Sequence, residues 1–218
     1  MNWVQDVDSY CERLGPTFWA EPVNAVTNLA FIIAAVLVWP RIKGRWEGRV
    51  LAFLIAAIGL ASGTHHTVAQ VWSGAADSLS ILVFILFYLY LASRDMLGLG
   101  RWASLGMVLA FFPYAAVAVP VFSMLPFLGS SAAYAPVALL IAVYALLVRN
   151  RNRTTARRMG YGAALLTISI LARSFDEPLC ANIPLGTHFL WHVLNGILLG
   201  YMALIWHAHV LAGRGRAL

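Results

Sequence analysis

Seven stretches of the chain are apolar over about the length that a helix needs to cross a membrane. A spanning helix takes about 20 mostly apolar residues, and 61% of the 218 residues are hydrophobic while only 11% are charged. Little sequence is left between these stretches for a soluble domain. We therefore predict an all-α integral membrane bundle of seven transmembrane helices, in a single domain over residues 1–218. The predicted spans are approximately residues 22–40, 49–70, 76–93, 102–120, 128–148, 157–175 and 185–210.

Basic residues lie almost entirely on one side of this seven-span arrangement. Thirteen of the fifteen lysines and arginines follow the first, third, fifth or seventh span, and only Arg13 and Arg173 lie elsewhere. Short basic loops stay in the cytoplasm. We therefore expect residues 1–21 to form an outer N-terminal segment, residues 22–210 the bundle and residues 211–218 a cytoplasmic tail. The thirteen basic residues are Arg41, Lys43, Arg45, Arg49, Arg94, Arg101, Arg149, Arg151, Arg153, Arg157, Arg158, Arg214 and Arg216.

The net charge of +6 is explained by this topology. Nucleic-acid-binding proteins gather basic residues into a patch or along one face, and the basic loops here show no patch interleaved with aromatic residues. Residues 1–8 are acidic and lack the basic and apolar regions of a signal peptide, so we expect the first span to direct insertion itself. The sequence indicates no nucleic-acid partner and no obligate protein partner.

Polar side chains within the spans gather at one predicted depth. His188 and His192 are four residues apart at the start of the seventh span, so they share one face of a helix. Ser62 and His66 have the same spacing near the outer end of the second span, and Asp77 begins the third. Ionisable side chains inside a membrane are costly and are usually functional. We predict that the five residues form one site in the outer half of the membrane.

Three imidazoles suit a catalytic zinc ion, because they leave its fourth position open. We predict that His66, His188 and His192 are the zinc ligands, and a water on that position would have its pKa lowered to about 7 and act as a hydroxide nucleophile. Asp77 would take up a proton and return it to a leaving amine, and Ser62 would donate a hydrogen bond to the oxyanion. The predicted reaction is hydrolysis of an amide or ester. A site at this depth favours a lipid substrate.

Two neighbouring groups of polar residues have open interpretations. We expect His65 to cap a helix or to lie at headgroup level, because its ring points about a third of a turn away from that of His66. Arg173 and Asp176, near the end of the sixth span, either form an ion pair beside the site or lie separately at the membrane interface.

The two cysteines and several acidic residues fall on the predicted outer side. Cys11 and Cys180 are able to form a disulfide in an oxidising compartment, and the alternative is a pair of inert buried thiols. Asp8, Glu12 and Glu21 carry the hard oxygen ligands that suit calcium. An acidic outer end that only reflects the charge asymmetry and caps the first helix is an equal alternative.

Over nearly its whole length the chain resembles the alkaline ceramidases. These are membrane amidases in a superfamily of seven-span hydrolases that also includes the adiponectin receptors. The final pair of histidines is the most specific motif. The resemblance rests on the stretch from Phe18 to Asn28, on Ser62 with His66 and Asp77, and on His188 with His192.

The resemblance implies the same roles as the chemistry. It implies that His66, His188 and His192 are zinc ligands, that Asp77 is the acid and base, and that Ser62 polarises the substrate or binds the oxyanion.

The resemblance bears on calcium as well. The family's eukaryotic members bind calcium through an early Asp-Trp-x-Glu-x-Asn pattern and a glutamate at the start of the first span. Glu12 and Glu21 match this arrangement, whereas Ser9, Tyr10 and Leu14 stand where the aspartate, tryptophan and asparagine belong. Asp8 is displaced from the aspartate position by one residue.

Together these features predict a zinc-dependent intramembrane amidase that hydrolyses ceramide or a related N-acyl lipid to a fatty acid and an amine. The resemblance also implies a bond between Cys11 and Cys180. The short loops are similar to those of a bacterial member, which implies a bacterial inner membrane with the site towards the periplasm. Two other functions remain open: a receptor-like or ligand-binding protein with structural zinc, and a transporter that uses the histidines and Asp77 as a proton relay.

Overall fold

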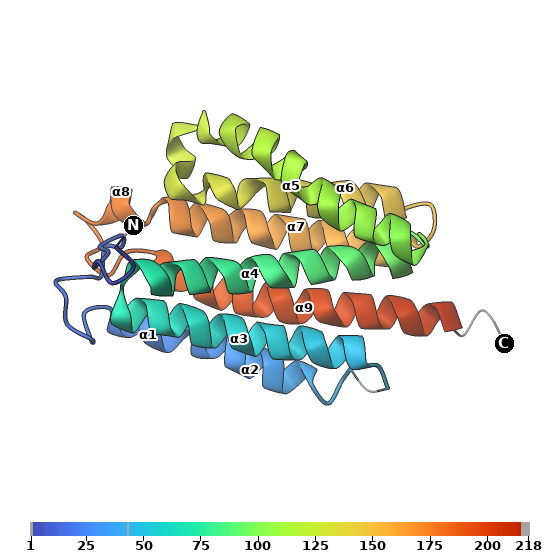
Figure 1. Cartoon of the computed structure of the whole chain (residues 1–218), viewed down its shortest axis with the longest axis horizontal. Helices are drawn as coiled ribbons and strands as arrows, with labels where there is room; N and C mark the ends of the chain where they lie inside the picture. The colour runs from blue at the N-terminus through green and yellow to red at the C-terminus, as the bar shows by residue number, and fades with distance from the viewer. Residues whose placement is uncertain (1, 43, 215–218) are drawn as a thin grey trace.

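The computed structural model describes residues 2–42 and 44–214, and over these ranges the chain is all-α, without a strand. Long helices lie side by side in an elongated bundle, with the N-terminal segment at one end and the end of the last helix at the other (Figure 1). The predicted basic residues Lys43 and Arg216 and the end of the predicted tail lie outside the described residues. The elements are α1 (Pro22–Thr27), α2 (Leu29–Val38), α3 (Trp46–Val68), α4 (Val71–Leu91), η1 (Ala92–Met96), α5 (Arg101–Ser123), η2 (Pro126–Ala133), α6 (Ala135–Val148), α7 (Arg153–Ser174), α8 (Asp176–Leu179) and α9 (His188–Arg214).

Among the described residues, four helices are long and apolar enough to cross a membrane: α3, α4 with η1, α5 and α9. The pair η2 and α6, bent by 74°, makes a fifth if it counts as one span. The first predicted span is divided at Asn28 into the shorter helices α1 and α2, and the sixth coincides with α7, whose first turns carry three arginines. The all-α class is confirmed, and the count of seven spans stays a prediction.

A two-residue turn joins α3 to α4 and places two parts of the predicted site at one end of the bundle. Ala69 ends α3 in a left-handed conformation with φ 47°. Gln70 then begins α4 with a capping box, in which its side chain and that of Ser73 satisfy each other's backbone N–H groups. His66 therefore lies in the last turn of α3 and Asp77 in the second turn of α4, on either side of this turn.

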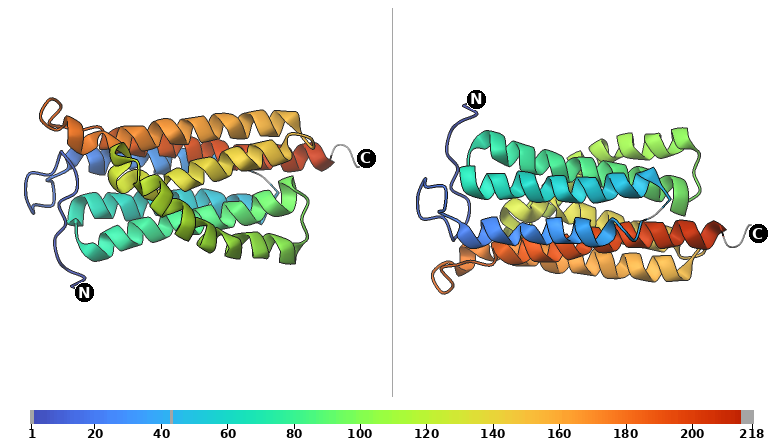
Figure 2. Two further views of the ribbon diagram at one scale, coloured as in Figure 1. Left: turned by 90° about the horizontal axis from the view of Figure 1, so that it is seen from above. Right: turned by 90° about the horizontal axis from the view of Figure 1, so that it is seen from below.

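Helix α9 runs between α2 and α7 and packs against both (Figure 2). Gly196 and Gly200 face α2, and small residues at this spacing let two membrane helices approach closely. A Cβ atom at Gly196 would lie 2.9 Å from the carbonyl carbon of Ala30, whereas one at Gly200 would lie 3.4 Å from Cβ of Ala34. The two helices are thus packed more tightly at Gly196 than at Gly200.

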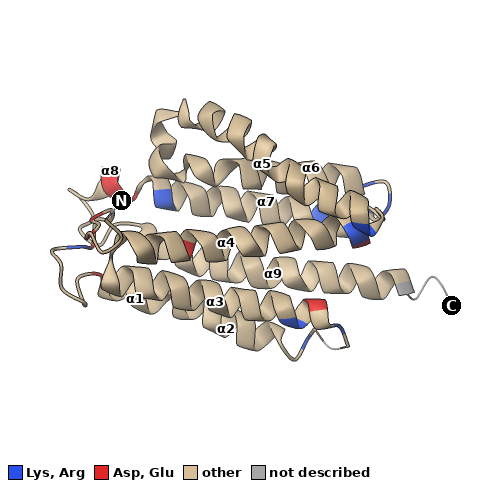
Figure 3. Cartoon of the chain, in the orientation of Figure 1, with Lys and Arg blue, Asp and Glu red and all other residues tan. Residues whose placement is uncertain are grey.

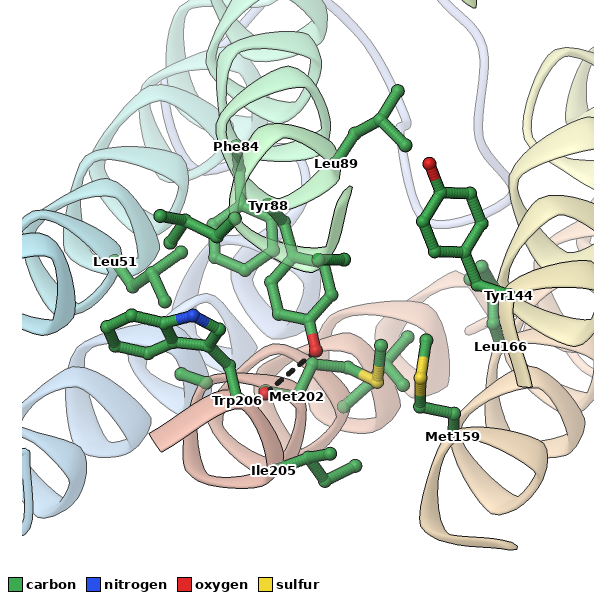
Figure 4. Close-up of a cluster of buried hydrophobic side chains, with 14 of the residues drawn as sticks. Leu51, Phe84, Tyr88, Leu89, Tyr144, Met159, Leu166, Met202, Ile205 and Trp206 are labelled. Atoms are coloured by element: carbon green, nitrogen blue, oxygen red, sulfur yellow. Dashed lines mark hydrogen bonds between the residues drawn. The ribbon is translucent and has the colours of Figure 1, made fainter. Parts of the chain in front are cut away.

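The core behind the site joins α4 to α9. Tyr88 reaches across from α4 and its hydroxyl donates to the carbonyl oxygen of Met202 at 3.1 Å (Figure 4). Trp206, which is fully buried, donates from Nε1 to Asp95 at 2.7 Å. Both polar groups are satisfied within the apolar core, so the two helices are held in one register.

Charged residues divide between the two ends of the bundle. Figure 3 shows Lys and Arg mainly at the end where α9 finishes, and Asp and Glu mainly at the other end. Arg13 and Arg173 are the two predicted exceptions at the acidic end. At the basic end Glu47 and Asp95 both bind Arg94. The predicted asymmetry is present, and the orientation of the bundle across a membrane stays a prediction.

Candidate active site

Three histidines from two helices meet inside the acidic end of the bundle. His66 lies in the last turn of α3, and His188 and His192 lie in the first two turns of α9. Ring centroids are 4.6 Å apart for His66 and His192, 4.7 Å for His188 and His192, and 5.1 Å for His66 and His188. The three residues are 0–2% exposed. The fold therefore brings together the three histidines that the sequence analysis grouped.

These rings have the donor atoms for a metal ion. One nitrogen from each lies within 4.8 Å of the others, so the three rings could hold one metal ion. His66 Nε2, His188 Nδ1 and His192 Nε2 are buried without a hydrogen-bond partner in the described part of the chain. Buried polar atoms are normally satisfied. The cluster therefore fits a metal ion.

Residues near α1 orient two of the rings. His66 Nδ1 contacts Glu21 Oε2 at 2.6 Å, and His192 Nδ1 contacts the Thr27 hydroxyl at 2.9 Å. Because that hydroxyl donates to the carbonyl oxygen of Val23, His192 Nδ1 is the donor in the second contact. Such contacts fix the tautomer of a metal-binding histidine. They leave Nε2 of both rings free for the ion.

The adjacent His65 does not join the cluster. Its Nδ1 contacts the Ser73 hydroxyl at 3.1 Å, and Ser73 itself belongs to the cap of α4. His66, rather than His65, is the histidine in the group of three.

Asp77 and Ser62 lie at the same end of the bundle as the three histidines. Ser62 is buried one helical turn before His66 and adjoins the carboxyl group of Asp77. Asp77 Oδ1 is buried without a hydrogen-bond partner among the described residues. A buried carboxyl group next to a hydroxyl is able to take up or release a proton.

Tyr10 covers the cluster, and the sequence did not identify it as a site residue. Its ring stacks on that of His188 with centroids 3.8 Å apart and lies 5.0 Å from that of His66. Burial raises the pKa of Tyr10, although Arg173 opposes the rise, so the side chain is a neutral phenol at pH 7. The one feature of the sequence that could have identified Tyr10 is its position next to Cys11, because a disulfide from Cys11 to Cys180 would hold Tyr10 against the start of α9.

That disulfide is present. Cys11 and Cys180 are bonded, with their Cα atoms 5.4 Å apart, as predicted. The bond ties the N-terminal segment to the loop before α9 and so holds Tyr10 over His188.

Asp176 supports the same junction and forms no ion pair with Arg173. Its Oδ1 accepts from the backbone N–H groups of Thr187 at 2.7 Å and His188 at 2.8 Å, and its Oδ2 accepts from that of Cys11 at 3.0 Å. A carboxylate at the start of a helix satisfies free N–H groups and interacts favourably with the helix dipole. Of the two sequence interpretations, the ion pair is excluded, because Arg173 and Asp176 are not among the salt bridges of the described residues.

The three carboxylates proposed for calcium are not brought together. Asp8 is exposed, and the buried Glu12 accepts from the backbone N–H groups of Val23 and Asn24, both at 2.7 Å. Glu12 therefore caps α1, which is the alternative interpretation of the acidic residues. Within residues 2–42 and 44–214, the histidine cluster is the only group of three or more histidine, cysteine or acidic residues arranged for a metal.

Arg13 lies beside the carboxylate of Glu21, the third residue proposed for calcium. Arg13 Nε donates to Glu21 Oε1 at 2.5 Å, and its other nitrogens donate to the carbonyl oxygens of Gly15 and His66 at 2.9 and 3.3 Å. Burial raises the pKa of Glu21, and Arg13 opposes this rise. A guanidinium in this place supplies the positive charge that a calcium ion would otherwise bring, so these residues do not fit calcium.

Comparison with known protein families shows what this arrangement is similar to. A family model described as Ceramidase matches residues 9–216, nearly the whole chain, including all the residues of the histidine cluster. Neither the curated proteins nor the solved structures gave a match.

Proposed function

The chain belongs to the Ceramidase family, and on this basis we propose that it is a zinc-dependent intramembrane amidase. Its substrate is ceramide or a related N-acyl lipid, and its products are a free fatty acid and an amine. The observation that carries the proposal is the set of three buried imidazole nitrogens that face one another without partners. Next to them lies a carboxylate that also has a free oxygen.

Each residue has a role that follows from its position. His66, His188 and His192 hold the ion, which supplies an acidified water and polarises the substrate carbonyl when it is bound. Asp77 accepts a proton as the new C–O bond forms and transfers it to the amine nitrogen as the C–N bond breaks. Ser62 donates a hydrogen bond to the carbonyl oxygen as negative charge develops on it.

An apolar cavity supports a lipid substrate. It is partly open to the outside, and its walls are almost entirely apolar. Trp191 and Tyr134 line it near the histidines, and Phe31, Phe84 and Met202 line it deeper in the bundle. These walls suit an acyl chain, because they offer it apolar contacts and few polar groups.

Several apolar helices suit a membrane protein, and we place the chain in a bacterial inner membrane with the site towards the periplasm. The acidic end of the bundle, which holds the histidines, is then the outer end.

The direct test is to incubate the detergent-solubilised protein with a panel of N-acyl lipids and measure released fatty acid. We expect release by the wild type, with about one zinc per chain. His192→Ala should lose both zinc and activity. Asp77→Asn should keep zinc and lose about 100-fold or more of the rate.

Two results would contradict the proposal. Unchanged hydrolysis by Asp77→Asn would remove the acid and base role. Release from no lipid in the panel, with zinc bound, would favour the receptor-like alternative.

A further inference from the structure

Arg173 has an aromatic environment at the end of α7. Its guanidinium carbon lies 5.9 Å from the ring centroid of Tyr10, 5.5 Å from that of Tyr134 and 5.8 Å from that of Trp191. Three rings from three parts of the chain therefore surround one cation. Contacts of this kind hold a guanidinium in a fixed orientation and leave its charge unneutralised.

The hydrogen bonds of Arg173 go to hydroxyl groups. Nη1 donates to Ser130 at 2.7 Å and to Ser131 at 3.0 Å, and Nη2 donates to the Tyr10 hydroxyl at 3.5 Å. A guanidinium has five N–H donors, so these contacts leave capacity for a further acceptor.

No carboxylate neutralises Arg173 among the described residues. Asp176 is three residues further along and would be the natural partner, but both of its oxygens accept backbone N–H groups. Asp77 acts on Arg173 through its charge, yet the two residues form no ion pair in residues 2–42 and 44–214. Burying a charge is costly unless a group of opposite charge pairs with it, and Arg173 is partly buried.

The same rings connect Arg173 to both parts of the site. Tyr10 stacks on His188, and Trp191 precedes His192 in the chain. Tyr134 and Trp191, whose rings are 4.7 Å apart, line the apolar cavity. Because Tyr134 and Trp191 both line the cavity and contact Arg173, a ligand whose acyl chain fills the cavity would reach Arg173 at the end where these two rings lie.

We propose that Arg173 binds an anionic group on the amine side of the substrate, so that the preferred substrates are N-acyl lipids with a carboxylate or phosphate head group. This inference rests on the proposed amidase function. A guanidinium forms paired, charge-assisted hydrogen bonds with such oxyanions. Arg173 is then a specificity-determining residue that touches the substrate away from the reacting atoms.

The test compares two lipids that share an acyl chain, N-palmitoylglycine and N-palmitoylethanolamine, which differ in a carboxylate against a neutral hydroxymethyl group. We expect the wild type to prefer the anionic lipid in kcat/KM by about tenfold or more. Arg173→Gln should bring this ratio close to one, mainly through KM. Arg158→Gln removes the same charge from an exposed position at the other end of α7 and should leave the ratio unchanged.

Binding gives a second readout that needs no turnover. Isothermal titration of both lipids into Asp77→Asn should show the same preference, and the double variant Asp77→Asn, Arg173→Gln should lose it. Thermal melting of each variant checks that the bundle is intact.

The outcomes separate this inference from the proposed function. Preferential binding of the anionic lipid without hydrolysis of either lipid contradicts the amidase and supports the role of Arg173. Equal hydrolysis of both lipids, unaffected by Arg173→Gln, overturns the role of Arg173 and leaves the amidase standing. If free palmitate inhibits the wild type but not Arg173→Gln, while the substrate ratio stays at one, Arg173 binds the product and the head-group assignment is wrong.

Discussion

Glu21 joins three parts of the molecule through one carboxylate. Its Oε1 accepts from Arg13, and its Oε2 contacts both His66 Nδ1 and the side-chain amide of Asn24. The N-terminal segment, α1 and α3 thus meet at this residue. Because the contact uses Nδ1 of His66, it directs Nε2 towards the other two histidines.

Replacing Glu21 should weaken the metal site without removing a ligand. We expect Glu21→Gln to lower the affinity for zinc by about 10–100-fold, since outer contacts of metal-binding histidines have effects of this size. Titration against a competing chelator measures the affinity. Glu177→Gln, at an exposed acidic residue, is the control. Equal affinities for both variants would show that the contact does not orient His66.

The contact between Arg13 and Glu21 predicts how the protein responds to calcium. A calcium site with a dissociation constant 100-fold below the added calcium would stabilise the protein by about 2.7 kcal/mol. Because Arg13 already supplies a cation beside Glu21, we expect calcium to cause no rise in the melting temperature relative to a chelator. Arg13→Gln should itself melt earlier, because it leaves a buried carboxylate without its partner. A clear rise of the wild-type melting temperature in calcium would contradict this assignment.

At the scale of elements, helix ends and helix crossings position the site. The turn at Ala69 and Gln70 sets α3 against α4, and Asp176 caps the start of α9 at His188. The close approach of α2 and α9 at Gly196 then determines how far α9 lies from α1 and from Thr27, which contacts His192.

Two glycines in α9 provide a matched pair for testing this crossing. Gly196→Ala should destabilise the bundle by about 1–3 kcal/mol, the usual cost of overpacking, because the new Cβ would press on the backbone of Ala30. Gly200→Ala places its Cβ at an ordinary contact distance from Ala34 and should be close to neutral. Melting temperatures of the two variants provide the comparison. Equal effects would show that the crossing tolerates both side chains.

At the scale of the whole molecule, charge is distributed along the long axis of the bundle. Most basic residues lie at the end where α9 finishes, and most acidic residues lie at the end that holds the histidines. Basic ends remain in the cytoplasm during insertion.

This distribution predicts the orientation of the chain. Two reporters test it when each is fused to the C-terminal end of the chain and expressed in a bacterium. Green fluorescent protein should fluoresce and alkaline phosphatase should stay inactive, because this end of the chain would remain in the cytoplasm. Fusion of either reporter after a loop at the acidic end should give the opposite pattern. An active phosphatase at the end of the chain would reverse the proposed orientation.

Hydropathy and spacing were enough for the helical class and for the three histidines that cluster in the fold. Both are local properties: an apolar stretch predicts a helix whatever it packs against, and His188 and His192 share a face because of helical geometry alone. Local patterns could not predict the break at Asn28 or the bend between η2 and α6. Inside η2, Gly129 adopts a non-helical conformation with φ 48°, and the apolar composition of the segment does not reveal that either.

Tertiary structure alone decided which groups surround the histidines. Thr27 and His192, like Cys11 and Asp176, are 165 residues apart in the chain, and no sequence spacing relates them. Tyr10, Arg13 and Arg173 acquire their neighbours when the N-terminal segment folds over the ends of α3, α7 and α9. For the same reason the acidic residues near the N-terminus suggested calcium: the sequence shows their charge, but only packing shows that Arg13 neutralises Glu21 and that backbone N–H groups satisfy Glu12.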